Sequence, residues 1–202
     1  MLKIDLIQGS QEWLSYRMSK IMATDAGVIL DVNPFKSLEN LYEEKLGLTQ
    51  NIKTNPAMQR GHDLEPVARE LFSHNIGIEM TPCVCENNTN SWMAASLDGL
   101  SSCDKYILEI KCPNEDTHKL AINGQVKPYY YAQCQHQLAV TEAEILYYFS
   151  YRPEYTSNPF AVIEFIPDEK YIQNMIKLEK KFWFDLCQMT PPNPVWTFSE
   201  KK

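Results

Sequence analysis

Two acidic residues and a lysine near the middle of the chain have the types and spacing that metal-dependent hydrolysis requires. Asp98 follows the mostly apolar run 92–97, and Glu109 and Lys111 lie in and just after a second run, 106–110. A short polar turn separates the runs, which is typical of two strands joined by a loop. Because side chains at i and i+2 of a strand share a face, Glu109 and Lys111 point the same way. If the hairpin pairs the two runs, Asp98 faces the same place.

Two carboxylates that converge in an apolar sheet repel each other and lose hydration, so they need a cation. Mg²⁺ suits them, with Mn²⁺ as an alternative, because it takes one or two carboxylates and leaves positions open for a phosphate oxygen and a water. Lys111 would orient or deprotonate that water, or stabilise charge on phosphorus. The group therefore suits phosphodiester hydrolysis. The competing interpretation is a turn at Asp98 and two solvent-facing strand residues.

A guanidinium and a hydroxyl in the first 24 residues are candidates for binding an anion. Ser10 is a predicted N-cap of a helix on which Trp13, Tyr16 and Arg17 share a face. Thr24 is predicted to cap a second, short helix, whose free N–H groups would face an anion. From the residues alone, the competing interpretations are an arginine lying across an aromatic surface and a threonine that only caps a helix.

An amide on a later helix is a further candidate. Pro128 opens this helix, and Tyr130, Gln133 and Gln137 share one of its faces. The Gln133 amide could hydrogen-bond a phosphate or hold Lys111 in place. The competing interpretation is a polar helix face beside an aromatic core stripe.

Alternating helix and strand patterns predict an α/β domain. A helical stripe over 56–75 contains Pro66, so either a new helix begins near Asp63 or the helix kinks there. Other predicted helices cover 37–46, follow Asn114, and run from Asp168 to about Gln188; predicted strands are 78–86 and the hairpin 145–151 with 160–166. We also expect a polar linker over 49–55 and an extended tail after Thr190.

Length and composition narrow the class of protein. The 202 residues fit a single domain, 1–202, and a 44% hydrophobic fraction is that of an ordinary globule. The net charge of −7 argues against a protein that coats nucleic acid, and predicts positive charge gathered in one groove. Six cysteines without C-x-x-C spacing predict reduced, mostly buried thiols. The absence of a long apolar stretch or signal peptide predicts no membrane association and a cytoplasmic location, in a bacterial or phage-infected cell or another intracellular DNA compartment.

Five short motifs occur in a fixed order along most of the chain. They are Glu-Trp-Leu-Ser-Tyr-Arg at 12–17, Gly-His-Asp-Leu-Glu-Pro-Val-Ala-Arg at 61–69, Ser-Leu-Asp-Gly at 96–99, Leu-Glu-Ile-Lys-Cys-Pro at 108–113 and Tyr-Tyr-Ala-Gln-Cys-Gln at 130–135. In this order they resemble the lambda-type phage exonucleases, or YqaJ-like viral recombinases, of the PD-(D/E)xK nuclease superfamily. The resemblance implies a restriction-endonuclease-like α/β core, a mixed central sheet flanked by helices with the acidic residues and lysine at one edge.

The resemblance also implies roles for individual residues. Metal would be held by Asp98, Glu109 and the carbonyl of Ile110, with Glu65 supporting the site directly or through water, and Lys111 would assist catalysis. Residues that would contact the DNA and its 5′-phosphate are Arg17, Thr24, Ser96, Tyr130 and Gln133.

The implied activity is that of a magnesium-dependent 5′-to-3′ exonuclease acting on duplex DNA ends. It would leave 3′ overhangs for recombination by single-strand annealing, as a ring-shaped homotrimer working with an annealing protein. Two alternatives stay open: an endonuclease on the same fold, and a DNA-end-binding scaffold that does not cut. The acidic residues count against the scaffold, because a pure binder gains nothing from carboxylates facing phosphates.

Overall fold

A mixed seven-stranded sheet forms the centre of the computed structural model, which describes residues 1–49 and 56–192. The expected linker over 50–55 and the tail from 193 lie outside the described residues. Along the sheet the strands are β1 (Leu2–Ile4), β3 (Met80–Glu86), β4 (Met93–Ser101), β5 (Tyr106–Lys111), β6 (Ile145–Tyr151) and β7 (Phe160–Phe165), and β2 (Ile21–Met22) pairs with β4 off this path. The β5–β6 and β2–β4 pairs are parallel and the others antiparallel, so the predicted α/β class with a mixed sheet is confirmed.

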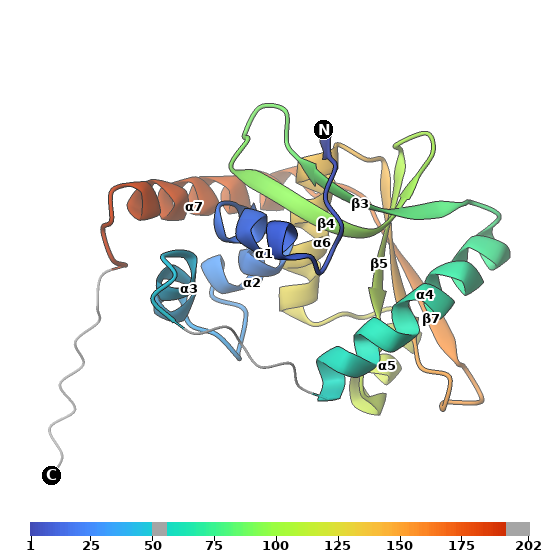
Figure 1. Cartoon of the computed structure of the whole chain (residues 1–202). Coiled ribbons are helices and arrows are strands. Elements are labelled where there is room, and N and C mark those ends of the chain that lie inside the picture. The colour runs from blue at the N-terminus through green and yellow to red at the C-terminus, as the bar shows by residue number, and fades with distance from the viewer. Residues whose placement is uncertain (50–55, 193–202) are drawn as a thin grey trace, which may run out of the picture.

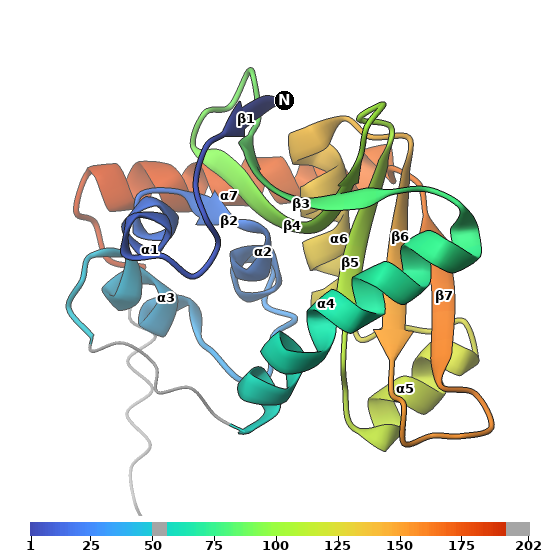
Figure 2. The same ribbon diagram turned by 45° about the vertical axis from the view of Figure 1, so that its right-hand side comes forward.

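Helices pack on both faces of this sheet (Figures 1 and 2). They are α1 (Gln11–Met18), α2 (Ala23–Ile29), α3 (Leu38–Lys45), α4 (Pro56–Ile76), α5 (Glu115–Ile122), α6 (Pro128–Thr141) and α7 (Glu169–Cys187). Figure 2 shows α4 crossing in front of β5 and β6, with α6 behind the sheet. Within residues 1–49 and 56–192, no helix is both long and apolar enough to cross a membrane.

Apolar side chains from α4 and α6 fill the space on either side of the central strands. Ala68 and Phe72 of α4 pack against Leu108 and Phe149. On the other side, residues of α6 such as Leu138 belong to a second buried cluster with side chains of β3, β4, β5 and β6. Burial of this apolar surface stabilises the sheet and fixes both helices relative to β5.

N-cap residues in the sequence predicted most helix starts correctly. The side chains of Ser10, Ser37, Asn114 and Asp168 each accept a backbone N–H of the first turn, as N-caps do. Thr24 was predicted wrongly as a cap: Met22 is the N-cap of α2, and its N–H donates to the Asp25 carboxylate at 2.8 Å. Thr24 instead lies exposed in the first turn.

Three further expectations need correction or refinement. Helix α4 runs unbroken through Pro66, so no new helix begins near Asp63. The acidic residues and the lysine lie on β4 and β5 in the middle of the sheet, not at one edge. All six cysteines are free thiols, but only Cys85 and Cys134 are buried, whereas Cys103 and Cys187 are exposed.

A buried histidine–glutamate pair joins α6 and α7. His136 of α6 and Glu179 of α7 are both fully buried, and their Nδ1 and Oε1 atoms lie 2.8 Å apart. Burial lowers the pKa of His136, but the Glu179 carboxylate outweighs it and the net pKa is raised. The pair explains how Glu179 sits within the apolar stripe of α7.

Candidate active site

The β4–β5 hairpin brings the two predicted carboxylates together. Gly99 pairs with Leu108, and continuing this register sets Asp98 beside Glu109. The regular pairing stops there, and the Ile110 N–H donates to the Asp98 Oδ2 at 2.6 Å. A Cβ at Gly99 would lie 2.8 Å from the Cβ of Met80, so glycine is required for this close approach.

Two amides and an ammonium surround the carboxylate of Glu109, which is only 1% exposed. Gln133 and Gln137, one turn apart on α6, donate to its Oε1 and Oε2 at 2.6 and 2.5 Å, respectively. Lys111 Nζ forms an ion pair with the same carboxylate. The Gln133 amide therefore holds Glu109, and its predicted contact with a DNA phosphate stays a prediction. The i, i+4 spacing was the available signal that Gln137 reaches the same group.

The electrostatics of this cluster favour a bound cation. Burial raises the pKa of Asp98 well above its usual value, and the nearby charges of Glu109 and Glu65 raise it further. Burial alone would lower the pKa of Lys111, but the Glu109 and Asp98 carboxylates outweigh this and raise it. The two carboxylates thus stabilise the charged form of Lys111 in this arrangement.

The donor set fits a hard divalent ion. Asp98 and Glu109 are adjacent oxygen donors that repel each other, as the raised pKa of Asp98 reflects. Across residues 1–49 and 56–192, no three His, Cys, Asp or Glu side chains already converge in a metal-binding group. Glu109 instead contacts Lys111, and Glu65 contacts Arg69. An ion would compete with these lysine and arginine contacts.

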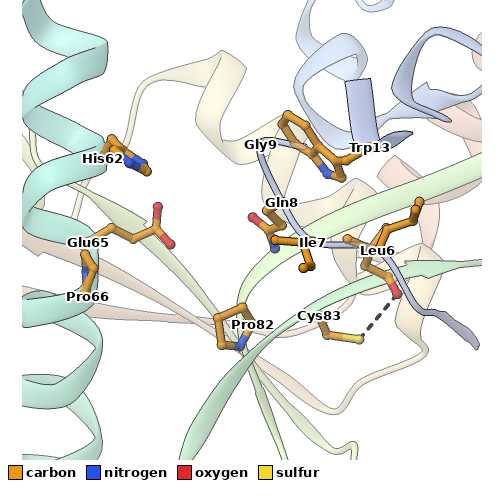
Figure 3. Close-up of a pocket in the computed structure, with 11 residues that line it drawn as sticks. Leu6, Ile7, Gln8, Gly9, Trp13, His62, Glu65, Pro66, Pro82 and Cys83 are labelled. Carbon is orange, nitrogen blue, oxygen red and sulfur yellow. Dashed lines mark hydrogen bonds between the residues drawn. The ribbon is translucent and has the colours of Figure 1, made fainter. Parts of the chain in front are cut away.

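Helix α4 reaches the hairpin through Arg69. Its Nη2 atom pairs with Glu65, four residues earlier, and its Nε atom donates to the Asp98 carbonyl. Glu65 also lines a hollow of about 530 Å³ together with His62, Gln8, Trp13 and Pro82. Figure 3 shows His62 and Glu65 on one side of this hollow and Gln8 and Trp13 on the other. Asp98 and Glu109 do not line this hollow, whereas Glu65 does.

The predicted phosphate-binding residues form a second group on α1 and α2. The Arg17 guanidinium lies 4.6 Å from the Trp13 ring centroid, and its Nη2 donates to the Thr24 hydroxyl at 3.2 Å. Trp13 Nε1 in turn donates to the Ser96 hydroxyl on β4 at 2.8 Å, two residues before Asp98. Arg17 thus both packs on Trp13 and lies beside the Thr24 hydroxyl. The aromatic contact does not exclude the anion-binding role.

Tyr130 belongs to the group around Lys111. Its ring centroid lies 5.1 Å from the Lys111 Nζ, within the range of a cation–π contact. The structure thus brings Tyr130, Gln133, Glu109 and Lys111 together. Ile110 is placed with them through its N–H contact to Asp98.

Sequence reasoning missed Lys45, which contacts the backbone of the predicted phosphate-binding residues. This side chain on α3 is 4% exposed and pairs with Asp25 at 2.6 Å. Its Nζ also donates to the carbonyls of Arg17 and Lys20 at 2.9 and 2.7 Å. A lysine near the end of an amphipathic helix gives no local sign of burial, so only its tertiary partners reveal this role.

Known proteins similar to this chain include uncharacterised relatives and exonucleases. Residues 12–144 match the model of the YqaJ-like viral recombinase domain. An uncharacterised protein of Acanthamoeba polyphaga mimivirus is 28% identical over 68% of the chain, which accounts for 28% of that protein. The uncharacterised protein YqaJ of Bacillus subtilis is 26% identical over 86% of the chain and 55% of its own length. The chain thus spans about half or less of these two relatives.

Solved structures agree with the sequence match. The alkaline exonuclease LHK-Exo from Laribacter hongkongensis is 29% identical, with a TM-score of 0.77 over 90% of this chain and 94% of that one. The same exonuclease in complex with dAMP gives a TM-score of 0.78 at 28% identity, with the same shares of both chains covered. A phage-related exonuclease from Haemophilus somnus shares the fold. It is 13% identical, with a TM-score of 0.60 over 84% of this chain and 96% of that one. Since the family model covers more than half of the chain, the protein belongs to the YqaJ-like viral recombinase family.

Proposed function

We propose that this protein is a magnesium-dependent exonuclease that digests one strand of duplex DNA from its 5′ end. Membership of a recombinase family with alkaline exonucleases among its structural neighbours supports nuclease activity. The observation that carries the finer proposal is the Asp98–Glu109–Lys111 cluster, in which Glu109 is buried and both of its carboxylate oxygens are held by amides of α6. These two hydrogen bonds keep the Glu109 carboxylate in one position, as a group that holds a metal ion requires.

Each residue of the cluster has a distinct part in the proposal. Asp98, Glu109 and the Ile110 carbonyl would hold Mg²⁺ or Mn²⁺, with Glu65 as a direct or water-mediated support. When bound, the ion would lower the pKa of a water and polarise the phosphate. Lys111, protonated and beside Glu109, would stabilise negative charge as it builds on the phosphate oxygens.

The polarity in the proposal rests on Arg17 and Thr24. A terminal 5′-phosphate carries more charge than an internal diester, and a guanidinium can grip two of its oxygens. Arg17 packs on Trp13, which lines the hollow on the side opposite Glu65 (Figure 3). The structural neighbour solved with dAMP contains a nucleoside 5′-monophosphate, the kind of product that such an exonuclease would release. A homotrimer around DNA and an annealing partner belong to the same proposal.

End-labelled linear duplex and closed circular duplex, each with magnesium or chelator, distinguish the proposed activity from its alternatives. An exonuclease digests the linear DNA with magnesium and spares the circle. An endonuclease cuts both, and a scaffold binds the ends and cuts neither.

A further inference from the structure

We propose that Phe35 and Tyr129 form a stacking subsite for an unpaired nucleobase of the DNA substrate, and this inference rests on the proposed nuclease function. Phe35 lies in the loop between α2 and α3 and is 80% exposed. Tyr129 is the second residue of α6 and is half-buried. Their ring centroids lie 5.8 Å apart at an interplanar angle of 78°, an edge-to-face contact. Together with the high exposure of Phe35, this geometry leaves a face of its ring open to a ligand.

The pair is continuous with the catalytic cluster. Tyr129 contacts Tyr130, with ring centroids 4.4 Å apart, and the Tyr130 ring lies 5.1 Å from the Lys111 ammonium. A row of three aromatic rings therefore leads from the exposed Phe35 to Lys111. A base on Phe35 would thus belong to DNA already engaged at the catalytic lysine.

Local contacts hold Phe35 outward without burying it. Its N–H donates to the Asn33 side chain at 2.8 Å, and the Val32 N–H donates to the Gly27 carbonyl at 2.9 Å. Helix α2 packs so tightly on Tyr129 that a Cβ at Gly27 would lie 2.9 Å from the Tyr129 Cβ. Both halves of the pair are therefore anchored to α2. Because the Phe35 ring stays exposed, folding gains little from it and the ring is free to contact a ligand.

A nucleobase is the ligand that fits. The neighbouring Lys36 is paired with Glu44 at 2.5 Å, so the loop offers an aromatic face in preference to a free cation for phosphate. Base–aromatic stacking tolerates any sequence, because every base has a π face. An exonuclease meets every base in turn and needs this tolerance. The base must be unpaired, since a base inside the duplex is already stacked on both faces.

The test uses a duplex whose terminal base pair at the recessed 5′ end is replaced by an unpaired 2-aminopurine, with calcium in place of magnesium to prevent cutting. Wild-type protein should quench the 2-aminopurine fluorescence by stacking. Phe35→Ala should lose this quenching and bind the frayed end on the order of 10-fold more weakly, the typical effect of one stacking contact. Phe35→Trp should retain both, whereas Phe35→Leu, apolar without a π face, should behave like Phe35→Ala. Phe184→Ala on α7, where the phenylalanine is 62% exposed, is the matched control and should resemble wild type.

The outcomes separate this subsite from the proposed function. If Phe35→Ala digests linear duplex but quenches and binds as wild type does, the subsite is wrong and the nuclease proposal stands. If Phe35→Leu behaves like wild type, general apolar contact explains the effect and the stacking role is wrong. If wild-type protein neither binds nor digests duplex ends, both proposals fail together.

Discussion

Replacement of Lys45 by methionine should destabilise the protein strongly and weaken its recognition of a 5′-phosphate. The Lys45 ammonium has three partners, the Asp25 carboxylate at 2.6 Å and the carbonyls of Arg17 and Lys20 at 2.9 and 2.7 Å. In Lys45→Met, Asp25 stays buried, with the Met22 N–H at 2.8 Å still donating to it. Removing one partner of a buried ion pair costs about 3–5 kcal/mol. We therefore expect the free energy of unfolding to fall by about that amount.

Urea unfolding at pH 7 measures this loss, with Lys177→Met on α7 as the control, because Lys177 is exposed on its helix. Lys45→Met combined with Asp25→Asn should recover part of the lost stability, since it removes the buried unpaired charge. A Lys45→Met protein within about 0.5 kcal/mol of wild type, the usual range for a surface substitution, would refute this reasoning.

The pH dependence of stability supplies an independent check on the same pair. Burial tends to raise the pKa of Asp25, but Lys45 outweighs it and the net pKa is lowered. A carboxyl whose pKa is lower in the folded state contributes stability above its ordinary pKa, and this contribution is lost as pH falls through the lowered value. Wild-type protein should therefore lose stability in that acidic range, and Lys45→Met should lose less there.

Three other predictions concern the site and the assembly. Gln137→Leu removes the hydrogen-bond donor to Glu109 Oε2. Calorimetry should therefore show weaker Mn²⁺ binding, and steady-state kinetics should show a lower kcat. Unchanged metal affinity would exclude a positioning role for Gln137. Wild-type protein should digest 5′-phosphorylated duplex faster than 5′-hydroxyl duplex. This preference should shrink in Arg17→Ala and recover only in part in Arg17→Lys. An undiminished preference in Arg17→Ala would mean that Arg17 only packs on Trp13. Light scattering should give a mass of about three times 23.4 kDa, and a monomer under active conditions would remove the ring.

The convergence of Asp98, Glu109 and Lys111 was predictable because its signals are local. Alternation along a strand put Glu109 and Lys111 on one face, and a hairpin required only the short turn that follows β4. The turn was expected soon after the run 92–97, yet β4 continues to Ser101, because the missing side chain of Gly99 permits close packing under Met80. A glycine gives the same local signal in both cases.

Features that depend on distant partners were not predictable. Strand β5 lies in the middle of the sheet, and no local sequence pattern predicts the order of the strands. The Asp25 carboxylate that accepts the Met22 N–H at the start of α2 is also paired with Lys45, which lies 20 residues further along the chain. The direction of the Gln133 amide likewise depends on Glu109, which reaches it from another element.

The most direct test of the catalytic proposal is the digestion of 5′-phosphorylated linear duplex by wild type, Lys111→Ala and Asp98→Asn, measured alongside binding of the same DNA in calcium. We expect Lys111→Ala to bind ends nearly as wild type does while kcat falls on the order of 10²-fold or more, as expected for loss of a charge-stabilising group. Asp98→Asn should bind metal more weakly and lose activity. Wild-type turnover in Lys111→Ala, or full activity of the wild-type protein in chelator, would contradict the proposed metal-dependent hydrolysis.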